Sequence, residues 1–178
     1  MRNLFKFLLV PYGLLLCSPG CTALAQTREK VAAAYTSQIG VREATGHNDG
    51  VMVETYLHYC GLGKGEPWCA SFVCWTFGQA SVSNPRSGYC PNLFTPGHVI
   101  YKRSIHKPQK VPEQGDVWGL YFPDKRRVAH VGFVDQWGSK YVITVEGNTN
   151  EAGSREGDGV YRKRRPISSI YVVAKYIK

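Results

Sequence analysis

The sequence has no apolar run long enough to cross a membrane, and it is short of acidic residues. An apolar segment near the N-terminus, residues 7–16, is interrupted by Pro11 and Gly13, whereas a membrane-spanning helix needs about 20 apolar residues. Asp and Glu number 13 against 22 Lys and Arg, which gives a formal net charge of +9. We therefore expect no transmembrane anchor, and a protein attracted to anionic partners such as cell-wall polymers, acidic lipids or nucleic acid.

Sequence motifs for nucleic-acid, nucleotide and calcium binding are also missing. There is no zinc-finger spacing, no glycine-rich phosphate loop and no basic helix. The densest basic cluster, residues 162–165 (Arg-Lys-Arg-Arg), lies in a predicted strand, and we interpret it as a solvated basic edge. Residues 43–49 have acidic and amide side chains but lack the alternating oxygen ligands of a calcium loop. We therefore expect no nucleic-acid partner, no metal and no other cofactor.

The first 25 residues are typical of a cleaved export signal. Arg2 and Lys6 precede the apolar segment, and residues 23–25 (Ala-Leu-Ala) have the small first and third residues that a signal peptidase accepts. We predict a mature chain of residues 26–178 that forms a single domain. Its location would be periplasmic or extracellular, without stable membrane insertion. Loss of Arg2 and Lys6 would lower the formal charge from +9 to +7.

Lipid attachment near the cleavage point is an alternative to simple cleavage, because Cys17 and Cys21 lie there. Leu16 is too large for a good lipoprotein site before Cys17, and Ser-Pro-Gly before Cys21 is a poor one. Four cysteines remain after the leader: Cys60, Cys69, Cys74 and Cys90. Four thiols are too few for a disulfide scaffold, although export makes a disulfide feasible.

Cys69 begins an apolar run, residues 69–77, with the composition of a buried helix. Pro67 suits the first turn of a helix, where N–H groups have no intrahelical partner. Those N–H groups carry partial positive charge and stabilise a thiolate, the form of cysteine that attacks a carbonyl carbon. Cys69 is therefore a candidate nucleophile, which must stay free, and Cys74 is assigned to the core. The alternative is that both are ordinary small core residues.

The first half of the chain has apolar residues at helical spacing. Besides the Cys69 helix, we predict a helix over residues 27–40, capped by Thr27, and a second one that ends before Gly61. Asn48 or Asp49 would cap the second helix. Residues 81–112 are rich in Pro, Gly, Ser and Asn, which favours a loop with at most one short helix.

The second half of the chain has extended spacing. The predicted strands are residues 116–122, 129–136, 141–146, 159–164 and 170–177. Helices followed by antiparallel strands indicate an α+β fold. No internal repeat is visible, and nothing marks a second domain.

A cysteine nucleophile needs a base and a polar group that orients the base. His130 opens the apolar strand segment 130–134, and no other histidine of the chain lies at the edge of such a strand. Glu146 and Asn148 are two residues apart, so they share a face if the strand continues. A carboxylate that accepts from one imidazole nitrogen holds the other toward the thiol. The alternatives are a core histidine bonded to a backbone carbonyl and a glutamate at a solvent-facing strand end.

This arrangement makes a demand on strand pairing, because directly opposed side chains of an antiparallel pair project to the same face. A plain two-residue turn at Gly138–Ser139 would pair His130 with Gly147 and send Glu146 to the other face. We therefore predict a bulge or an odd-length connection, which would place His130 opposite Glu146 or Asn148.

Four segments, in this order, resemble the CHAP family of cysteine, histidine-dependent amidohydrolases/peptidases. They are residues 67–73 (Pro-Trp-Cys-Ala-Ser-Phe-Val), 115–117 (Gly-Asp-Val), 129–134 (Ala-His-Val-Gly-Phe-Val) and 146–148 (Glu-Gly-Asn). The resemblance spans roughly residue 43 to the C-terminus. Residues 43–50 are also similar to the region ahead of the cysteine in phage-lysin-like members.

The resemblance implies a papain-like α+β fold, in which N-terminal helices, including the nucleophile helix, pack on a C-terminal antiparallel sheet. It also implies peptidoglycan as the substrate, Cys69 as nucleophile and His130 as base, with Glu146 and Asn148 as the polar residues behind the base. Calcium-binding members carry an acidic loop just before the cysteine, and residues 61–65 do not resemble it.

We expect Trp68 and the turn at Asn48 and Asp49 to flank the substrate groove, although capping and turn formation explain the last two residues equally well. The sequence as a whole predicts an exported peptidoglycan hydrolase that cuts stem-peptide amides through a cysteine acyl-enzyme, as an N-acetylmuramoyl-L-alanine amidase or an endopeptidase. The alternatives are a cysteine peptidase acting on protein and a non-catalytic cell-wall-binding module. Nothing in the sequence identifies the amide that is cut, an inhibitor or an immunity protein.

Overall fold

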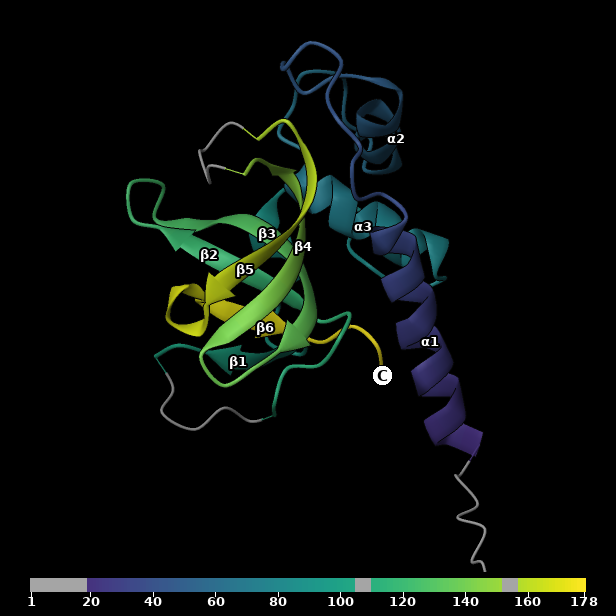
Figure 1. Cartoon of the computed structure of the whole chain (residues 1–178), viewed down its shortest axis with the longest axis vertical. Helices are drawn as coiled ribbons and strands as arrows, with labels where there is room; N and C mark the ends of the chain where they lie inside the picture. The colour runs from purple at the N-terminus through teal and green to yellow at the C-terminus, as the bar shows by residue number, and fades with distance from the viewer. Residues whose placement is uncertain (1–18, 105–109, 152–156) are drawn as a thin grey trace, which may run out of the picture.

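Helices occupy the first half of the chain and strands the second, as the change in apolar spacing predicts. The computed structural model describes residues 19–104, 110–151 and 157–178 (Figure 1). The helices are α1 (Pro19–Thr36), α2 (Val51–Tyr59) and α3 (Cys69–Gln79), with the 3-10 helices η1 (Cys90–Leu93) and η2 (Ile167–Ser169). The strands are β1 (Val99–Lys102), β2 (Val117–Phe122), β3 (Arg127–Trp137), β4 (Tyr141–Thr149), β5 (Gly159–Pro166) and β6 (Val172–Ala174). The predicted α+β class is confirmed.

The strands form one antiparallel sheet in the order β1-β6-β2-β3-β4-β5. Each of the predicted strands is present. The prediction of a loop over β1 was wrong, because this short edge strand pairs with β6, which lies far along the chain. Its residues, Val-Ile-Tyr-Lys, do not alternate between apolar and polar, so no local pattern reports the pairing.

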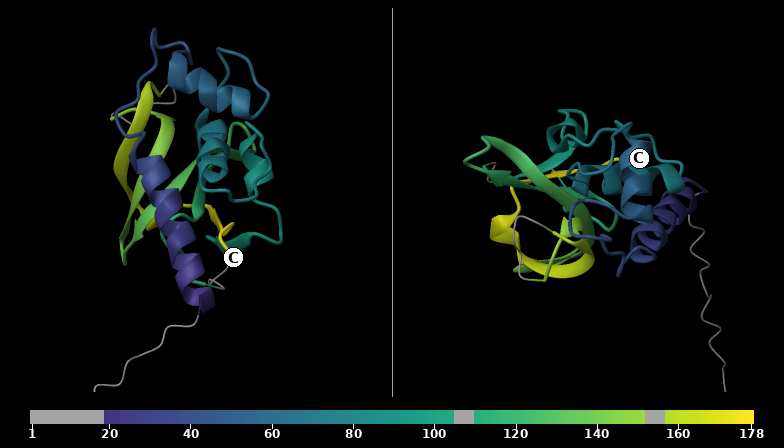
Figure 2. Two further views of the ribbon diagram at one scale, coloured as in Figure 1. Left: turned by 90° about the vertical axis from the view of Figure 1, so that its right-hand side faces the viewer. Right: turned by 90° about the horizontal axis from the view of Figure 1, so that it is seen from above.

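The helices lie together on one side of the sheet (Figures 1 and 2). α3 contacts β3 and β4 on one side and α1 and α2 on the other, so the nucleophile helix lies between the sheet and the remaining helices. This is the packing that the sequence predicts for an apolar helix buried on most sides. Among the described residues, no helix is both long and apolar enough to span a bilayer.

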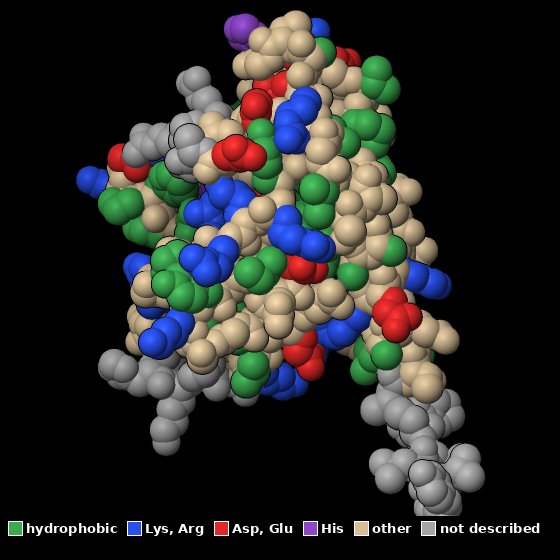
Figure 3. Space-filling view, viewed as in Figure 1, with side chains coloured by type: hydrophobic (Ala, Val, Ile, Leu, Met, Phe, Trp, Pro, Cys, Tyr) green, Lys and Arg blue, Asp and Glu red, His purple; other side chains and the backbone are tan. Residues whose placement is uncertain are grey.

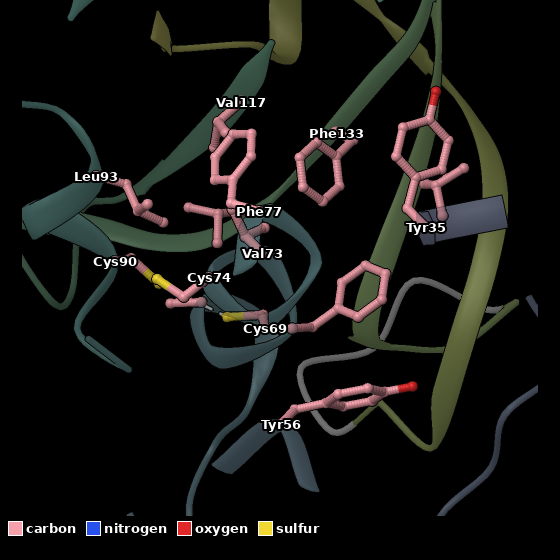
Figure 4. Close-up of a cluster of buried hydrophobic side chains, with 14 of the residues drawn as sticks. Tyr35, Tyr56, Cys69, Val73, Cys74, Phe77, Cys90, Leu93, Val117 and Phe133 are labelled. Atoms are coloured by element: carbon pink, nitrogen blue, oxygen red, sulfur yellow. Dashed lines mark hydrogen bonds between the residues drawn. The ribbon is translucent and has the colours of Figure 1, made fainter. Parts of the chain in front are cut away.

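The core that fixes α3 on the sheet centres on Phe133 of β3 (Figure 4). Its ring stacks on Tyr35 of α1 with 5.0 Å between centroids and meets Phe72 and Phe77 of α3 edge-on at 6.1 and 5.3 Å. All four side chains are fully buried, and burial of each contributes about 1.5–3 kcal/mol. These contacts hold the start of α3 at a fixed position relative to β3.

The starts of the first two helices differ from the prediction. Thr27 does not begin α1; it lies inside the helix, and its Oγ1 donates to the Ala23 carbonyl at 2.9 Å. α2 begins after Gly50 with no side-chain cap, because Asp49 instead accepts from the N–H and hydroxyl of Thr45 at 2.9 and 2.7 Å. Of the residues whose helical spacing predicts burial, Val31 and Tyr35 on α1 and Val53, Tyr56 and Leu57 on α2 are buried. Ile39, expected on the same face as Val31, follows the end of α1 and is 38% exposed.

Candidate active site

Cys69 is the first residue of α3, and Trp68 is the N-cap. Pro67, which was predicted inside the first turn, lies just before the cap instead. The first intrahelical bond runs from the Phe72 N–H to the Trp68 carbonyl at 2.8 Å, so the N–H groups of the first turn have no intrahelical acceptor. Their partial positive charge favours a thiolate at Cys69. Only 6% of Cys69 is exposed, which shields the thiol from bulk solvent.

β3 brings His130 to the nucleophile. The imidazole is close enough to the Cys69 thiol for each group to shift the pKa of the other, and its Nε2 lies 3.0 Å from Oε2 of Glu146 on β4. Because Nε2 faces the carboxylate, Nδ1 is the nitrogen available to the thiol. The ring also packs edge-on against Trp118, with 5.7 Å between centroids. The structure therefore aligns three of the predicted catalytic residues as thiol, imidazole and carboxylate.

The strand pairing contains the bulge that the sequence predicts. The register of β3 and β4 shifts at Asp135: on the turn side Trp137 pairs with Val142, and beyond the shift the partners move by one residue. If this shifted register is extended from Phe133 to His130, then His130 lies opposite Asn148, so His130 and Glu146 are on the same face of the sheet. Without the shift Glu146 would project from the opposite face.

Gly132 leaves the space through which Glu146 reaches the histidine. A Cβ at this position would lie 2.7 Å from the Val145 carbonyl oxygen, 3.1 Å from Cγ of Glu146 and 3.2 Å from Cζ2 of Trp118. The first distance is shorter than contact with a backbone oxygen allows, so a side chain here would displace β4 or the carboxylate. The glycine of the Ala-His-Val-Gly-Phe-Val segment therefore has no side chain to obstruct the Glu146 carboxylate.

Arg165 of β5 holds the Glu146 carboxylate from the side away from His130, and sequence reasoning missed it. Its Nε donates to Oε1 and its Nη2 to Oε2, both at 2.6 Å, and the Thr144 hydroxyl donates to Oε1 at 2.5 Å. Such bidentate pairs are among the strongest hydrogen bonds in proteins. The prediction of a solvated basic edge was right for Arg162, which is 47% exposed, and wrong for Arg165, which is 18% exposed. Alternation along the strand is the signal that separates them.

The protonation states follow from these contacts. Burial alone would raise the pKa of Glu146, but hydrogen bonds from Arg165 and His130 lower it to about 2. Burial alone would lower the pKa of His130, but its bonds to Cys69 and Glu146 raise it to about 9. Hydrogen bonds from Cys90 and His130 outweigh burial and hold the pKa of Cys69 well below its ordinary value. At neutral pH the site therefore pairs a thiolate with an imidazolium.

A second sulfur lies beside the nucleophile, and the sequence did not predict it. Sγ of Cys90, the first residue of η1, is 3.6 Å from Sγ of Cys69, and both thiols are free (Figure 4). The hydrogen bond with Cys69, together with burial, raises the pKa of Cys90 well above its ordinary value. Cys90 therefore keeps its proton and donates S–H to the Cys69 thiolate. Cys74 is fully buried in the core, as predicted.

Asn148 and Trp68 do not lie where they were predicted. Asn148 has a positive φ of 53° at an irregularity of β4, and its amide lies 2.9 Å from Oδ1 of Asn48 rather than against His130. With its oxygen turned toward Trp68, the same amide accepts from the Trp68 backbone N–H at 3.0 Å. Trp68 is fully buried and donates from Nε1 to Glu43 at 2.8 Å. Asn148 thus supports the chain that leads into the nucleophile helix, and Trp68 belongs to the core rather than to a groove wall.

Asn48 and Asp49 differ in their surroundings. Asn48 is half-buried and lines a hollow of about 460 Å³ together with Glu43, His47 and Asn148. Asp49 is only 2% exposed, and its carboxylate accepts hydrogen bonds from Thr45, as described for the start of α2. Asn48 is therefore placed where a groove residue can meet a ligand, whereas Asp49 shapes the turn. A substrate contact by Asn48 stays a prediction.

The described part of the chain contains no group of three or more His, Cys, Asp or Glu side chains arranged to hold a metal ion. Residues 61–65, ahead of the nucleophile, are Gly-Leu-Gly-Lys-Gly and offer no carboxylate ligand. That the reaction needs no metal or other cofactor stays a prediction from the sequence.

The chain has only a weak structural similarity to known proteins. No protein-family model matches the chain, and no curated protein sequence matches it. Two solved structures of the resuscitation promoting factor interacting protein RipA are similar in shape. The one mutated at a histidine has a TM-score of 0.41 and 18% identity, over 88% of this chain and 65% of that chain. The one mutated at a glutamate has a TM-score of 0.42 and 17% identity, over 95% of this chain and 71% of that chain. Likeness at this level assigns neither a family nor a function.

Proposed function

We propose that this chain is an exported cysteine hydrolase that cleaves amide bonds in the peptide stem of peptidoglycan. The observation that supports this most is the grouping of Cys69, His130 and Glu146, in which the thiol at a helix start neighbours an imidazole that lies 3.0 Å from a buried carboxylate. A wall-binding module has no use for a base and an orienting carboxylate in line with a thiol. The geometry therefore favours catalysis over binding alone.

The reaction would proceed through an acyl-enzyme. The Cys69 thiolate adds to a stem-peptide carbonyl carbon, and the C–N bond then breaks as the His130 imidazolium gives its proton to the leaving amine. Neutral His130 next takes a proton from a water molecule as the oxygen of that water attacks the thioester carbon. The C–S bond then breaks, which restores the Cys69 thiolate and releases the carboxylic acid product. Glu146 keeps the imidazole oriented throughout and favours its protonated form.

The first turn of α3 would stabilise the oxyanion of the tetrahedral intermediate. Its N–H groups have no intrahelical acceptor, and the N–H of Cys69 itself is the nearest to the reacting sulfur along the chain. One such donor is typically worth roughly 3 kcal/mol of transition-state stabilisation. The aromatic packing of α3 against Phe133 holds this turn rigidly, so little reorganisation is needed during the reaction.

The choice of peptidoglycan rests on the resemblance to the CHAP family and on charge. Without the predicted leader the chain would carry a formal net charge of +7, and Lys and Arg side chains are spread over the face of the sheet in Figure 3. This charge would draw the protein to an anionic wall and make binding weaken with added salt. Cleavage between sugar and peptide and cleavage within the stem use the same chemistry. The resemblance slightly favours the first, an N-acetylmuramoyl-L-alanine amidase.

The test is digestion of purified peptidoglycan by the wild type, Cys69→Ala and Cys74→Ala, with the new termini identified by mass spectrometry. Cys74→Ala is the matched control, because it removes from the same helix a thiol that bonds to the Ser87 carbonyl and not to His130 or Glu146. We expect soluble fragments from the wild type and the control, and none from Cys69→Ala. New amino termini would identify the amide that is cut.

Other outcomes would separate the alternatives. Release of fragments by Cys69→Ala at the wild-type rate would refute the mechanism. Wall binding without fragments from any variant would indicate a binding module, and cleavage of a protein such as casein in place of the wall would indicate a peptidase acting on protein.

A further inference from the structure

Two hollows are lined by residues that lie close in the chain to Cys69, to His130 or to Glu146. The first, of about 460 Å³, reaches from Gly65 to Asn148 of β4. The second, of about 360 Å³, reaches from Pro67 to Arg127 at the start of β3. Pro67 leads into the nucleophile helix, and the charge of Arg127 acts on the thiol of Cys90, so the second hollow lies next to the pair of sulfurs.

The second hollow is also tied to the nucleophile through η1. Tyr89 lines it and is followed in the chain by Cys90, whose Sγ is 3.6 Å from that of Cys69. A group bound in this hollow would therefore be held beside the nucleophile. We call this second hollow the basic hollow; it is lined by Cys60, Leu62, Glu66, Pro67, Arg86, Ser87, Gly88, Tyr89 and Arg127.

The basic hollow has two guanidinium groups that are held in place without a carboxylate partner. Arg127 lies over the Tyr89 ring at 5.0 Å, and Arg86 lies over the Tyr59 ring at 4.5 Å. Within the described part of the chain, neither forms an ion pair. Nη1 of Arg127 donates one hydrogen bond to the Val128 carbonyl at 3.1 Å. A ring beneath a guanidinium fixes its plane and leaves its N–H edge for another acceptor.

The charge of the basic hollow selects the kind of ligand. Glu66 lines it together with Arg86 and Arg127, so one carboxylate faces two cations and the balance is positive. A guanidinium edge matches a carboxylate with two parallel hydrogen bonds. Stem peptides carry free carboxylates next to the amides that a hydrolase of this kind would cut. The first hollow is lined by Glu43, His47 and two asparagines, and by no lysine or arginine.

We propose that the basic hollow binds a carboxylate of the stem peptide through Arg127 and Arg86, and that this contact decides which amide reaches Cys69. The inference rests on the proposed function, because it names a subsite of the same groove. It predicts that amidation of the recognised carboxylate weakens the substrate, since a carboxamide is uncharged and its NH₂ group faces donors.

The test uses synthetic muramyl stem peptides in pairs, in which each carboxylate in turn is either free or amidated. For the pair that differs at the recognised carboxylate, the wild type should cut the free acid with a kcat/KM roughly tenfold or more above that of the amidated peptide, as expected for a hydrogen bond to a charged group. Arg127→Gln and Arg86→Gln should raise KM for the acid, leave kcat nearly unchanged and leave the amide unaffected. Arg127→Lys should restore part of the preference.

Arg164→Gln is the matched control. Arg164 also lies over a tyrosine ring, that of Tyr141 at 4.6 Å, but on β5 and away from the basic hollow. This variant removes the same charge and the same kind of stacking, so it should keep the preference of the wild type. Equal cleavage of acid and amide by the wild type, or an equal loss on both in Arg127→Gln, would overturn the subsite.

Binding to the inactive Cys69→Ala protein, measured by calorimetry with the same peptides, separates this inference from the proposed function. Arginine-dependent binding of the acid without any cleavage by the wild type would refute the function and support the subsite. Cleavage that ignores every carboxylate would refute the subsite alone, and neither binding nor cleavage would refute both.

Discussion

Replacement of Glu146 by glutamine should change how stability depends on pH. The carboxylate is fully buried between His130 and Arg165, and these partners lower its pKa to about 2. A group whose pKa is lower in the folded chain stabilises the fold above its unfolded pKa and loses this effect as the pH falls through the folded value. For Glu146 the effect is complete above pH 4.5 and is lost toward pH 2.

The size of the effect follows from the two pKa values. A change from 4.5 to about 2, at 1.36 kcal/mol per unit, corresponds to roughly 3 kcal/mol. Glu146→Gln has no charge to lose and leaves Arg165 without its counterion, a change that typically costs about 3–5 kcal/mol. The variant should therefore be less stable than the wild type by about 3 kcal/mol at pH 6, and by less than about 1 kcal/mol at pH 2, where the wild-type carboxyl is itself gaining a proton.

The assay is urea unfolding followed by tryptophan fluorescence at several pH values between 6 and 2. The quantity of interest is the difference between the two proteins, because protonation of the other carboxylates is common to both. Glu29→Gln, which removes a charge from the exposed side of α1, should follow the wild type at every pH. A difference between wild type and Glu146→Gln that stays constant from pH 6 to pH 2 would show that the carboxylate is not held ionised by its partners.

Three further outcomes test the geometry of the site. Gly132→Ala should destabilise the fold by about 1–3 kcal/mol in thermal melts and should lower kcat more than it raises KM, because its Cβ would displace Glu146. Cys90→Ala should raise the pH at which iodoacetamide labels Cys69, because the thiolate loses a donor; an unchanged profile would mean that the second sulfur does not tune the first. In the wild type, kcat/KM should hold through neutral pH and fall above about pH 9, where His130 loses the proton that it gives to the leaving amine; a fall that begins near pH 7 would contradict this.

Local periodicity in the sequence was sufficient for the elements that bear the thiol and the base. Cys69 begins a helix because an apolar run follows it, and His130 lies on a strand because a short apolar run, Val-Gly-Phe-Val, follows it. The need for a bulge or an odd-length connection between β3 and β4 could be predicted from parity once His130 and Glu146 were taken to share a face, whereas the position of the bulge at Asp135 could not. These inferences needed no knowledge of contacts between distant segments.

The polar groups around the triad could not be predicted in the same way. Arg165 reaches Glu146 only because β5 pairs with β4, and the choice between it and its neighbours depends on which face of β5 meets the site. Asn148 shares a strand with Glu146, but its positive φ turns its amide to Asn48 instead of to the imidazole. A shared face is therefore guaranteed only while the backbone stays extended.

Cys90 marks the limit of sequence reasoning most clearly. It approaches the nucleophile from 21 residues away, because η1 packs against both β3 and α3. The loop that carries it has no apolar spacing from which that packing could be inferred. The contact nevertheless matters for reactivity, because an S–H donor beside Cys69 stabilises the thiolate over the thiol and so adds to the effect of the helix start and of His130. A property as central as the pKa of the nucleophile therefore depends on a residue whose place beside it only the packing of η1 determines.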